Sequence, residues 1–323
     1  MNGNAGPWAR VPFCRSPFFD PMQRNDWKTR LFMAVDRAHG RFNNRIKDRW
    51  PLLSVWLYHK PRSRFLHYRV ERALIAGKPL AVGQRQSIVL FTVAKAASMH
   101  VQKMVGELTK AHGMVPADFN AYFSTSSGKL YDHFHNPASL QRMFRPQGFF
   151  YGALRTHCAI PQPERFRVVV VLRDPRDVLT SQYYSQAYSH AIINERIAQQ
   201  RKKVLSQTID EAVMEEAPKL LKIYSDYLRE YSGKPWAHIT TYEKMVADHA
   251  SWLRSIASHC GLDQHPALVE KLATEGRNVK GTGDKNQHVR VAKSGDHKNK
   301  LKPETVAELD RMFGPMLAQA PWA

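Results

Sequence analysis

Three segments of this chain combine basic side chains with small residues in a way that suits the binding of phosphate groups. The first, residues 94–100 (AKAASMH), connects an apolar run to a helical pattern. Backbone N–H groups at the start of a helix lack intrahelical partners, and together with the helix dipole they attract anions. Lys95 adds a positive charge beside them. An ordinary turn with a surface lysine would look similar, and the Walker A pattern GxxxxGK followed by Ser or Thr is absent.

The second segment, residues 172–184 (LRDPRDVLTSQYY), joins an apolar run to a helical pattern. Asp174 is placed to cap the helix, and Asp177 lies in the first turn, where negative charge is favourable. Helix capping does not account for Arg173, which follows the apolar run directly. A guanidinium at the carboxyl end of a strand can bind a phosphate through two parallel hydrogen bonds, and Ser181 adds a hydroxyl donor about two turns into the helix.

The third segment, residues 290–299 (RVAKSGDHKN), is basic and contains a glycine. Two interpretations are open for it. It is either a solvated basic loop or a flap that closes over an anion with Arg290 and neighbouring backbone groups.

The elements that must position these segments alternate between apolar runs and helical patterns from about residue 86 onward. Strands are expected at residues 87–93, 148–154, 166–172 and 236–241, and helices at 101–112, 175–189, 209–231, 247–260, 266–275 and 302–317. The unbroken β-branched run at 166–172 suits a parallel sheet that is covered on both faces. The pattern predicts an α/β fold, a three-layer domain with a central, mostly parallel sheet and a P-loop-like phosphate-binding turn.

The positive charge of the chain is concentrated in its first quarter. The net charge is +20 over 323 residues, and residues 1–85 hold 17 Lys and Arg against 5 Asp and Glu, a net charge of +12. Apolar residues recur at helical spacing between Trp27 and Trp50. We therefore expect a basic helical N-terminal extension at 1–85, followed at 86–323 by the α/β domain that carries the three segments. The extension either packs on the domain or contacts an anionic acceptor or lipid surface.

Several classes of protein are not expected from the sequence. The three cysteines lie far apart and form no disulfide framework. No apolar run approaches the roughly 20 residues of a membrane-spanning helix, so we expect a cytoplasmic protein, with peripheral membrane contact through 1–85 left open. No nucleic-acid-binding motif is present. His133 and His135 have no further ligand at a recognisable spacing, so no metal is expected.

Together, and in this order, the three segments resemble the sulfotransferases that use 3′-phosphoadenosine 5′-phosphosulfate (PAPS). Residues 94–100 are similar to the PKSGTTW loop that holds the 5′-phosphosulfate, and residues 172–184 are similar to the strand–helix segment whose Arg and Ser hold the 3′-phosphate. Residues 290–299 resemble the RKGxxGDWKN segment. Two shorter matches are residues 155–157 (RTH), similar to the KTH of the catalytic histidine, and residues 242–245 (YEKM), similar to a YEDM turn.

The resemblance spans roughly residues 87–316 and implies transfer of a sulfuryl group from PAPS to a hydroxyl or amine by in-line displacement. It implies His157 as the catalytic base, Lys95 as the group that stabilises the departing oxygen, and Arg155 as a further stabiliser of charge. It implies a nucleotide site made of Lys95, Ala96, Ala97, Ser98, Met99, His100, Arg173, Ser181, Tyr242, Thr274, Arg290, Val291 and Ala292. PAPS is the cosubstrate, and no metal is required.

The first segment departs most from the family pattern. Ala96 and Ala97 replace Ser and Gly, Met99 stands where Thr or Ser is usual, and His100 replaces a Trp that stacks on adenine. The acceptor is unidentified: a carbohydrate, a lipid or a small molecule. Two alternatives remain, a P-loop kinase or NTPase-like enzyme, and a non-catalytic basic protein that binds membranes or polyanions. The sequence does not predict the oligomeric state.

Overall fold

The computed structural model describes residues 68–126, 133–189, 195–275, 294–319 and 322. The helices predicted between Trp27 and Trp50 lie outside these residues, as do Arg290, Val291 and Ala292 of the predicted nucleotide site.

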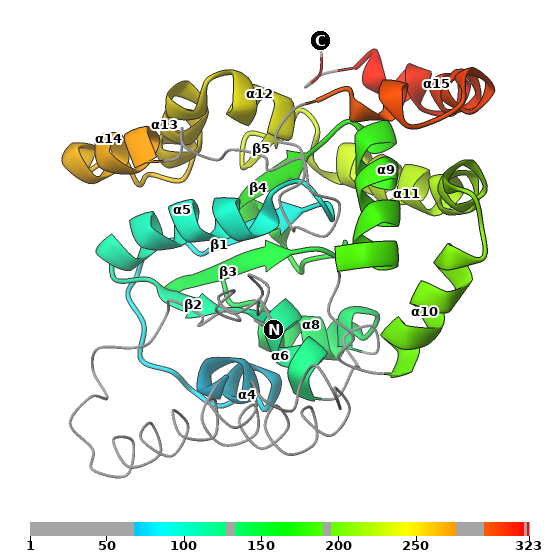
Figure 1. The fold of residues 1–323 in the computed structure, drawn as a ribbon. Helices are drawn as coiled ribbons and strands as arrows, with labels where there is room; N and C mark the ends of the chain where they lie inside the picture. The colour runs from blue at the N-terminus through cyan, green and yellow to red at the C-terminus, as the bar shows by residue number, and fades with distance from the viewer. Residues whose placement is uncertain (1–67, 127–132, 190–194, 276–293, 320–321, 323) are drawn as a thin grey trace, which may run out of the picture.

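Five parallel strands form the centre of the molecule, in the order β2-β3-β1-β4-β5 (Figure 1). Their bounds are β1 Ile88–Thr92, β2 Val115–Ala117, β3 Phe149–Leu154, β4 Arg167–Leu172 and β5 Ala237–Thr241. Every residue of β1 and β3 is buried, and β4 is buried from its second residue onward. Four of these strands were predicted. The fifth, β2, has only three residues, and one of them is Pro116.

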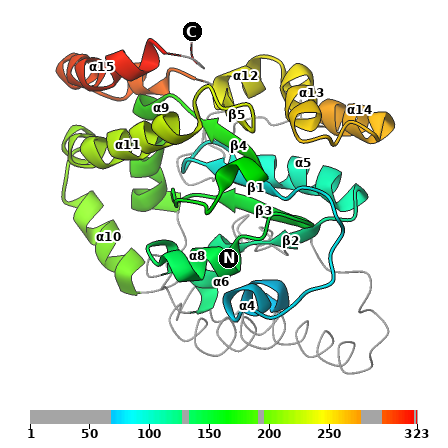
Figure 2. The same cartoon turned by 180° about the vertical axis from the view of Figure 1, so that it is seen from behind.

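Helices cover both faces of the sheet, so the predicted three-layer α/β fold is confirmed (Figures 1 and 2). One face of the sheet, with Val89 and Phe91 of β1, packs against α4 Arg69–Ile75, α6 Phe119–Ser126, α8 Pro137–Met143, α9 Pro175–Tyr184, α11 Ile209–Tyr231 and α15 Pro303–Leu317. The other face, with Ile88 and Leu90, packs against α5 Ser98–Ala111, α12 Tyr242–Ala247, α13 His249–His259 and α14 Pro266–Glu275. Successive side chains of a strand point to opposite faces, which divides the core in this way.

The described part of the predicted extension shares this core. In α4 the Leu74 side chain is fully buried, and Glu71 Oε1 accepts a hydrogen bond from the Asp118 N–H over 2.6 Å. Farther along, Arg85 O accepts a hydrogen bond from the Gly148 N–H, just before β3. The division at residue 86 stays a prediction, but residues 68–85 pack as part of the domain.

The ends of several helices follow from their capping residues. Thr208 and Glu211 form a capping box at the start of α11, and Asp248 caps α13 while α12 ends before it. The predicted helix at 247–260 is therefore α13 alone, with α12 as a separate helix. The predicted helix at 175–189 consists of α9 followed by a π-helical turn at Ser185–Ser189. A further helix, α10 Glu195–Leu205, was not predicted.

Candidate active site

The parallel sheet brings the predicted site segments to one edge. Residues 94–100 follow β1, residues 155–157 follow β3, Arg173 follows β4 and Tyr242 follows β5. Carboxyl ends of parallel strands lie together, and ligands of open α/β sheets bind outside them. Segments that are far apart in the sequence therefore lie close together in the fold.

The loop after β1 has a constrained backbone. Lys95 and Ala97 adopt left-handed conformations, with φ of 66° and 56°, and Ala97 is the N-cap of α5 without a side-chain hydrogen bond. Such conformations cost about 1 to 2 kcal/mol for a residue with a Cβ atom. Ala96 and Ser98 are buried while Met99 is exposed. The first turn of α5, with its N–H groups, therefore follows a loop with a strained backbone. Such strain often occurs where a backbone binds a ligand.

Arg173 connects three of the predicted segments. Its side chain is buried, and Nη1 donates a hydrogen bond to Lys95 O over 2.8 Å. The guanidinium carbon lies 4.3 Å from the centre of the Tyr242 ring, a cation–π contact. Within the described residues, Arg173 Nε is buried and has no hydrogen-bond partner. A buried cation with an unused donor suits an anionic ligand such as a phosphate.

Asp177 connects the second segment to the third. Its buried carboxylate accepts hydrogen bonds from the Gly295 N–H (2.7 Å), the His297 N–H (3.1 Å) and His297 Nδ1 (2.8 Å). Burial by itself would raise the pKa of Asp177, but these hydrogen bonds and the charge of Arg173 hold the pKa below its ordinary value. The helix-dipole role expected for this residue is therefore accompanied by a second one, the anchoring of residues 295–297.

Further bonds fix the backbone between β4 and α9. The Asp174 N–H donates to Glu243 Oε1 over 3.0 Å, and the Tyr224 hydroxyl donates to Arg173 O over 2.6 Å. Asp174 also caps α9, as predicted, by accepting from the Arg176 N–H. Ser181 is half-buried, farther along α9. The strand–helix unit that carries Arg173 and Ser181 is thus held from both α11 and α12.

His157 lies at the same edge and contacts a carboxylate. Its Nε2 is 2.7 Å from Glu230 Oε2 at the end of α11, and the ring is enclosed by the rings of Phe91, Tyr227 and Tyr231. The His157 side chain is 17% exposed. A histidine so placed retains one ring nitrogen for proton transfer.

Arg155 and Thr274 are both exposed. The charge of Arg155 acts on the buried carboxyl of Asp118, whose pKa is raised chiefly by burial. The Thr274 hydroxyl donates to Glu270 O within α14. Their predicted roles in catalysis and adenine binding stay predictions.

His100 belongs to a hydrogen-bonded chain that the sequence did not reveal. His100 Nε2 lies 3.0 Å from His249 Nε2, and His249 Nδ1 lies 3.1 Å from the carbonyl of Ala273, next to Thr274. A carbonyl only accepts, so His249 Nδ1 carries hydrogen, and in the neutral pair His100 Nε2 is the donor. Burial, then the neighbouring His249 and Lys103, lower the pKa of His100 to about 4. His100 is therefore neutral at neutral pH.

Comparison with known proteins decides the family. The sequence matches the profile of the sulfotransferase domain over residues 154–321. The chain belongs to the sulfotransferase domain family. The predicted sulfotransferase is thereby confirmed. The matched region contains His157, Arg173, Tyr242 and the third segment, and it begins after the divergent loop 94–100.

The fold of this sulfotransferase is similar to that of a solved sulfotransferase structure. The mouse sulfotransferase SULT7A1, complexed with PAP, is 14% identical, with a TM-score of 0.53, and the similarity covers 79% of this chain and 91% of that one. A retinol dehydratase in a complex with retinol and PAP is also 14% identical over 79% of this chain and 86% of that one, with a TM-score of 0.47. A comparison with curated protein sequences finds no significant match.

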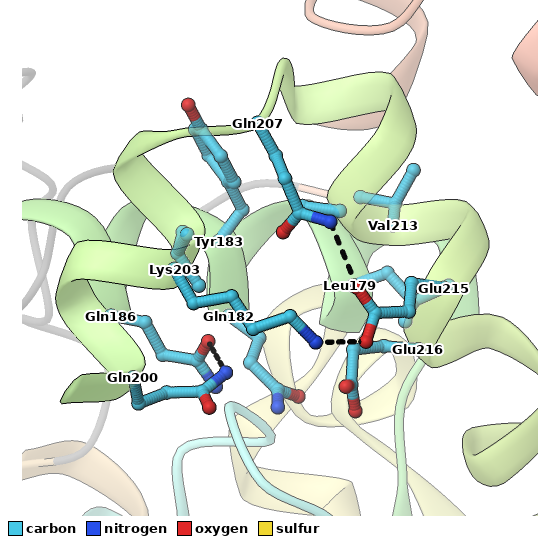
Figure 3. A pocket seen from close by; sticks show the side chains of 12 residues that line it. Leu179, Gln182, Tyr183, Gln186, Gln200, Lys203, Gln207, Val213, Glu215 and Glu216 are labelled. Carbon is cyan, nitrogen blue, oxygen red and sulfur yellow. Dashed lines mark hydrogen bonds and ion pairs between the residues drawn. The ribbon is translucent and has the colours of Figure 1, made fainter. Parts of the chain in front are cut away.

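A small hollow of about 20 Å³ between α9, α10 and α11 is separate from the predicted site (Figure 3). None of the predicted site residues lines it. Its polar side chains bond to one another, with Lys203 and Gln207 contacting Glu215, and Gln200 contacting Gln186. The hollow is therefore not part of the candidate active site of the sulfotransferase at the sheet edge.

Two classes of feature are absent from the part of the chain that the structure describes. No group of three His, Cys, Asp or Glu side chains there is arranged to hold a metal ion. No helix there has both the length and the apolar composition needed to cross a bilayer.

Sequence analysis missed two partners of the site residues in this sulfotransferase, Glu230 and His249. For Glu230 a signal existed, because Tyr227, Glu230 and Tyr231 are spaced for one face of a helix. For His249 the sequence offers no such signal, since it contacts His100 across 149 residues.

Proposed function

We propose that this sulfotransferase transfers a sulfuryl group from PAPS to a hydroxyl or amine of an acceptor, with His157 as the base. The observation that carries the proposal is the position of Arg173. It is buried, bonded to Lys95 of the first segment, stacked on Tyr242 and left with an unpaired Nε. PAP, 3′-phosphoadenosine 5′-phosphate, is bound by the similar mouse enzyme.

The residues of the site fit such an anionic nucleotide. Arg173 and Ser181 would hold the 3′-phosphate, and Lys95 with the first-turn amides of α5 would hold the 5′-phosphosulfate. The Tyr242 ring and His100 would contact the adenine. As the bridging oxygen departs with negative charge, Lys95 and the N-terminus of α5 would stabilise it, because charge stabilisation supplies most of the rate in such transfers.

Calorimetric titration with PAP tests the assignment. We expect the wild type to bind PAP and Arg173→Ala to bind at least about 10²-fold more weakly, because a charge-assisted bidentate contact is lost. Arg229→Ala is the matched control, since Arg229 is exposed on α11 and pairs only with Asp226 among the described residues. ATP with Mg²⁺ is the competing ligand. Failure of the wild type to bind PAP, or preferential binding of ATP, would reject the assignment.

The acceptor is to be found by incubating the protein with radiolabelled PAPS and sets of carbohydrates, lipids, phenols and small amines. His157→Ala is then expected to lose turnover by about 10² to 10⁴-fold while it binds PAP with unchanged affinity. Turnover retained by that variant would exclude His157 as the base.

We also propose a cytoplasmic location with peripheral membrane contact through the basic segment. Cys158 and Cys260 are free, which suits a reducing compartment. Contact with anionic vesicles is best tested by removing residues 1–67, which carry 13 Lys and Arg against 4 Asp and Glu. This truncation keeps α4, whose Leu74 belongs to the core. Equal vesicle binding by both proteins would reject the contact.

A further inference from the structure

His157 and Glu230 form a pair that neither the family match nor the sequence motifs assign. Nε2 of His157 and Oε2 of Glu230 are 2.7 Å apart, and their side chains are 17% and 22% exposed. Among the described residues, Glu230 forms no ion pair with a lysine or an arginine, whereas the neighbouring Asp226 pairs with Lys222 and Arg229 at the surface. In the described part of the molecule, the partner of Glu230 is thus the predicted base.

Packing leaves the imidazole little freedom to turn. The Phe91 ring of β1 stacks on the imidazole, with 6.3 Å between the ring centres, and the Tyr227 ring contacts the imidazole edge-on, with 5.2 Å between the ring centres. Tyr231 adds a third aromatic wall at 6.3 Å. Because Tyr227, Glu230 and Tyr231 recur at helical spacing, one face of α11 supplies two of these walls and the carboxylate together.

We propose that Glu230 is the positioning residue of His157, and that it sets the tautomer in which Nδ1 takes the proton of the acceptor. A carboxylate only accepts hydrogen bonds, so the bond at 2.7 Å places hydrogen on Nε2 and leaves a lone pair on Nδ1. Among the described residues, Nδ1 has no hydrogen-bond partner. The same division of roles, with a carboxylate orienting a histidine base, recurs in unrelated hydrolases.

The inference rests on the proposed function and completes its proton balance. A lone pair of the acceptor oxygen forms the new bond to sulfur, and the bond from sulfur to the bridging oxygen breaks, with its electron pair leaving on the nucleotide. The acceptor's proton moves to His157 Nδ1. The imidazolium that results is stabilised by the Glu230 carboxylate until the proton passes to solvent.

The tautomer can be measured without any substrate. Protein labelled with nitrogen isotopes in its histidines is studied by NMR, and His157→Gln identifies the signals of His157. We expect the wild type at neutral pH to carry hydrogen on Nε2, and Glu230→Gln to show a mixture of tautomers. A wild-type signal with hydrogen on Nδ1 would overturn the inference.

Kinetics then separate positioning from a merely structural contact. In Glu230→Gln we expect kcat to fall about 10²-fold, with the KM for PAPS and the affinity for PAP unchanged within about twofold. Glu230→Asp, which keeps the charge, should recover about a tenth or more of the wild-type kcat. Asp226→Asn is the matched control, because it removes a carboxylate from the preceding turn of α11 that does not contact His157, and it should keep the wild-type kcat.

The outcomes distinguish the two proposals. Wild-type kcat in Glu230→Gln, or equal losses of kcat and PAP affinity, overturns the positioning role while the proposed function stands. A wild type that binds no PAP and turns over no acceptor overturns both, whatever tautomer the NMR spectrum shows.

Discussion

Asp177 and His297 form a buried hydrogen-bonded pair, with Asp177 Oδ1 2.8 Å from His297 Nδ1. The same carboxylate accepts the N–H groups of Gly295 and His297. His297 stands where the family pattern has a Trp, and its Nδ1 donates this hydrogen bond to the carboxylate. The pair fixes residues 295–297 against α9.

Asp177→Asn should therefore lower both the stability of the protein and its affinity for PAP. We expect the free energy of unfolding to fall by about 2 to 4 kcal/mol, because a buried acceptor of three bonds is weakened. The affinity for PAP should fall at least about tenfold. Denaturant titration and calorimetry measure the two effects. Asp210→Asn, which removes a carboxylate that accepts from the Lys302 N–H at the surface, should cost about 1 kcal/mol or less.

The same pair should contribute to acid unfolding. The pKa of Asp177 is lowered below its ordinary value of 3.8, so its contribution to stability is present above pH 3.8 and is lost as the pH falls through the folded-state pKa. In Asp177→Asn this part of the acid dependence should disappear. Parallel stability curves for the two proteins below pH 4 would contradict the lowered pKa.

Ala97→Gly should stabilise the protein. Ala97 has a φ of 56°, which glycine adopts without a steric cost. We expect a gain of about 0.5 to 1 kcal/mol in the free energy of unfolding, since relief of the left-handed conformation exceeds the added entropy of the unfolded chain. Ala96→Gly is the control, because Ala96 is buried and is not among the positive-φ residues. It should destabilise the protein, and stabilisation by both variants would refute the role of backbone strain.

Glu71 should make stability decrease as the pH rises toward neutrality. Burial raises the pKa of Glu71 from 4.5 to about 7. A pKa that is raised in the folded state gives stability that is complete below pH 4.5 and is lost between pH 4.5 and about 7, by about 3 kcal/mol at most. The difference between the stability curves of the wild type and Glu71→Gln isolates this contribution. Glu308→Gln, at an exposed pair with Arg311, should leave the curve unchanged.

His100→Ala should weaken PAP binding by about 5- to 150-fold if His100 stacks on adenine, because stacking on an aromatic ring contributes about 1 to 3 kcal/mol per base. His100→Phe keeps an aromatic ring and should retain most of the affinity. Lys110→Ala, exposed at the other end of α5, serves as the control. Calorimetry with PAP gives the comparison, and equal affinities of wild type and His100→Ala would remove His100 from the nucleotide site.

The sequence was most informative where local physics decides the structure. The bounds of α11 and α14 were predicted as observed, because a capping box starts the first and Pro266 the second. The strand β4 was evident from its β-branched run. The short strand β2 and the polar helix α10, in which Val204 is buried, carry too little apolar pattern to be recognised.

The site was predictable as a set of residues but not as a network. Capping rules placed Asp177 correctly on α9, yet its bonds to Gly295 and His297 depend on chain segments that only the fold brings together. Glu230 and His249 were missed for the same reason. They act through contacts 73 and 149 residues apart in the sequence, which no local pattern encodes.

These long separations also bear on when the site forms during synthesis. Asp177 lies 120 residues before His297, and Lys95 lies 78 residues before Arg173. Contacts between residues so distant along the chain close slowly, and the ribosome delivers the chain from its N-terminus at about 5 to 20 residues per second. The sheet can pair as soon as β5 has emerged, but Asp177 has to wait for residues 295–297. We therefore expect the nascent chain to acquire its nucleotide site only in the last stage of its production.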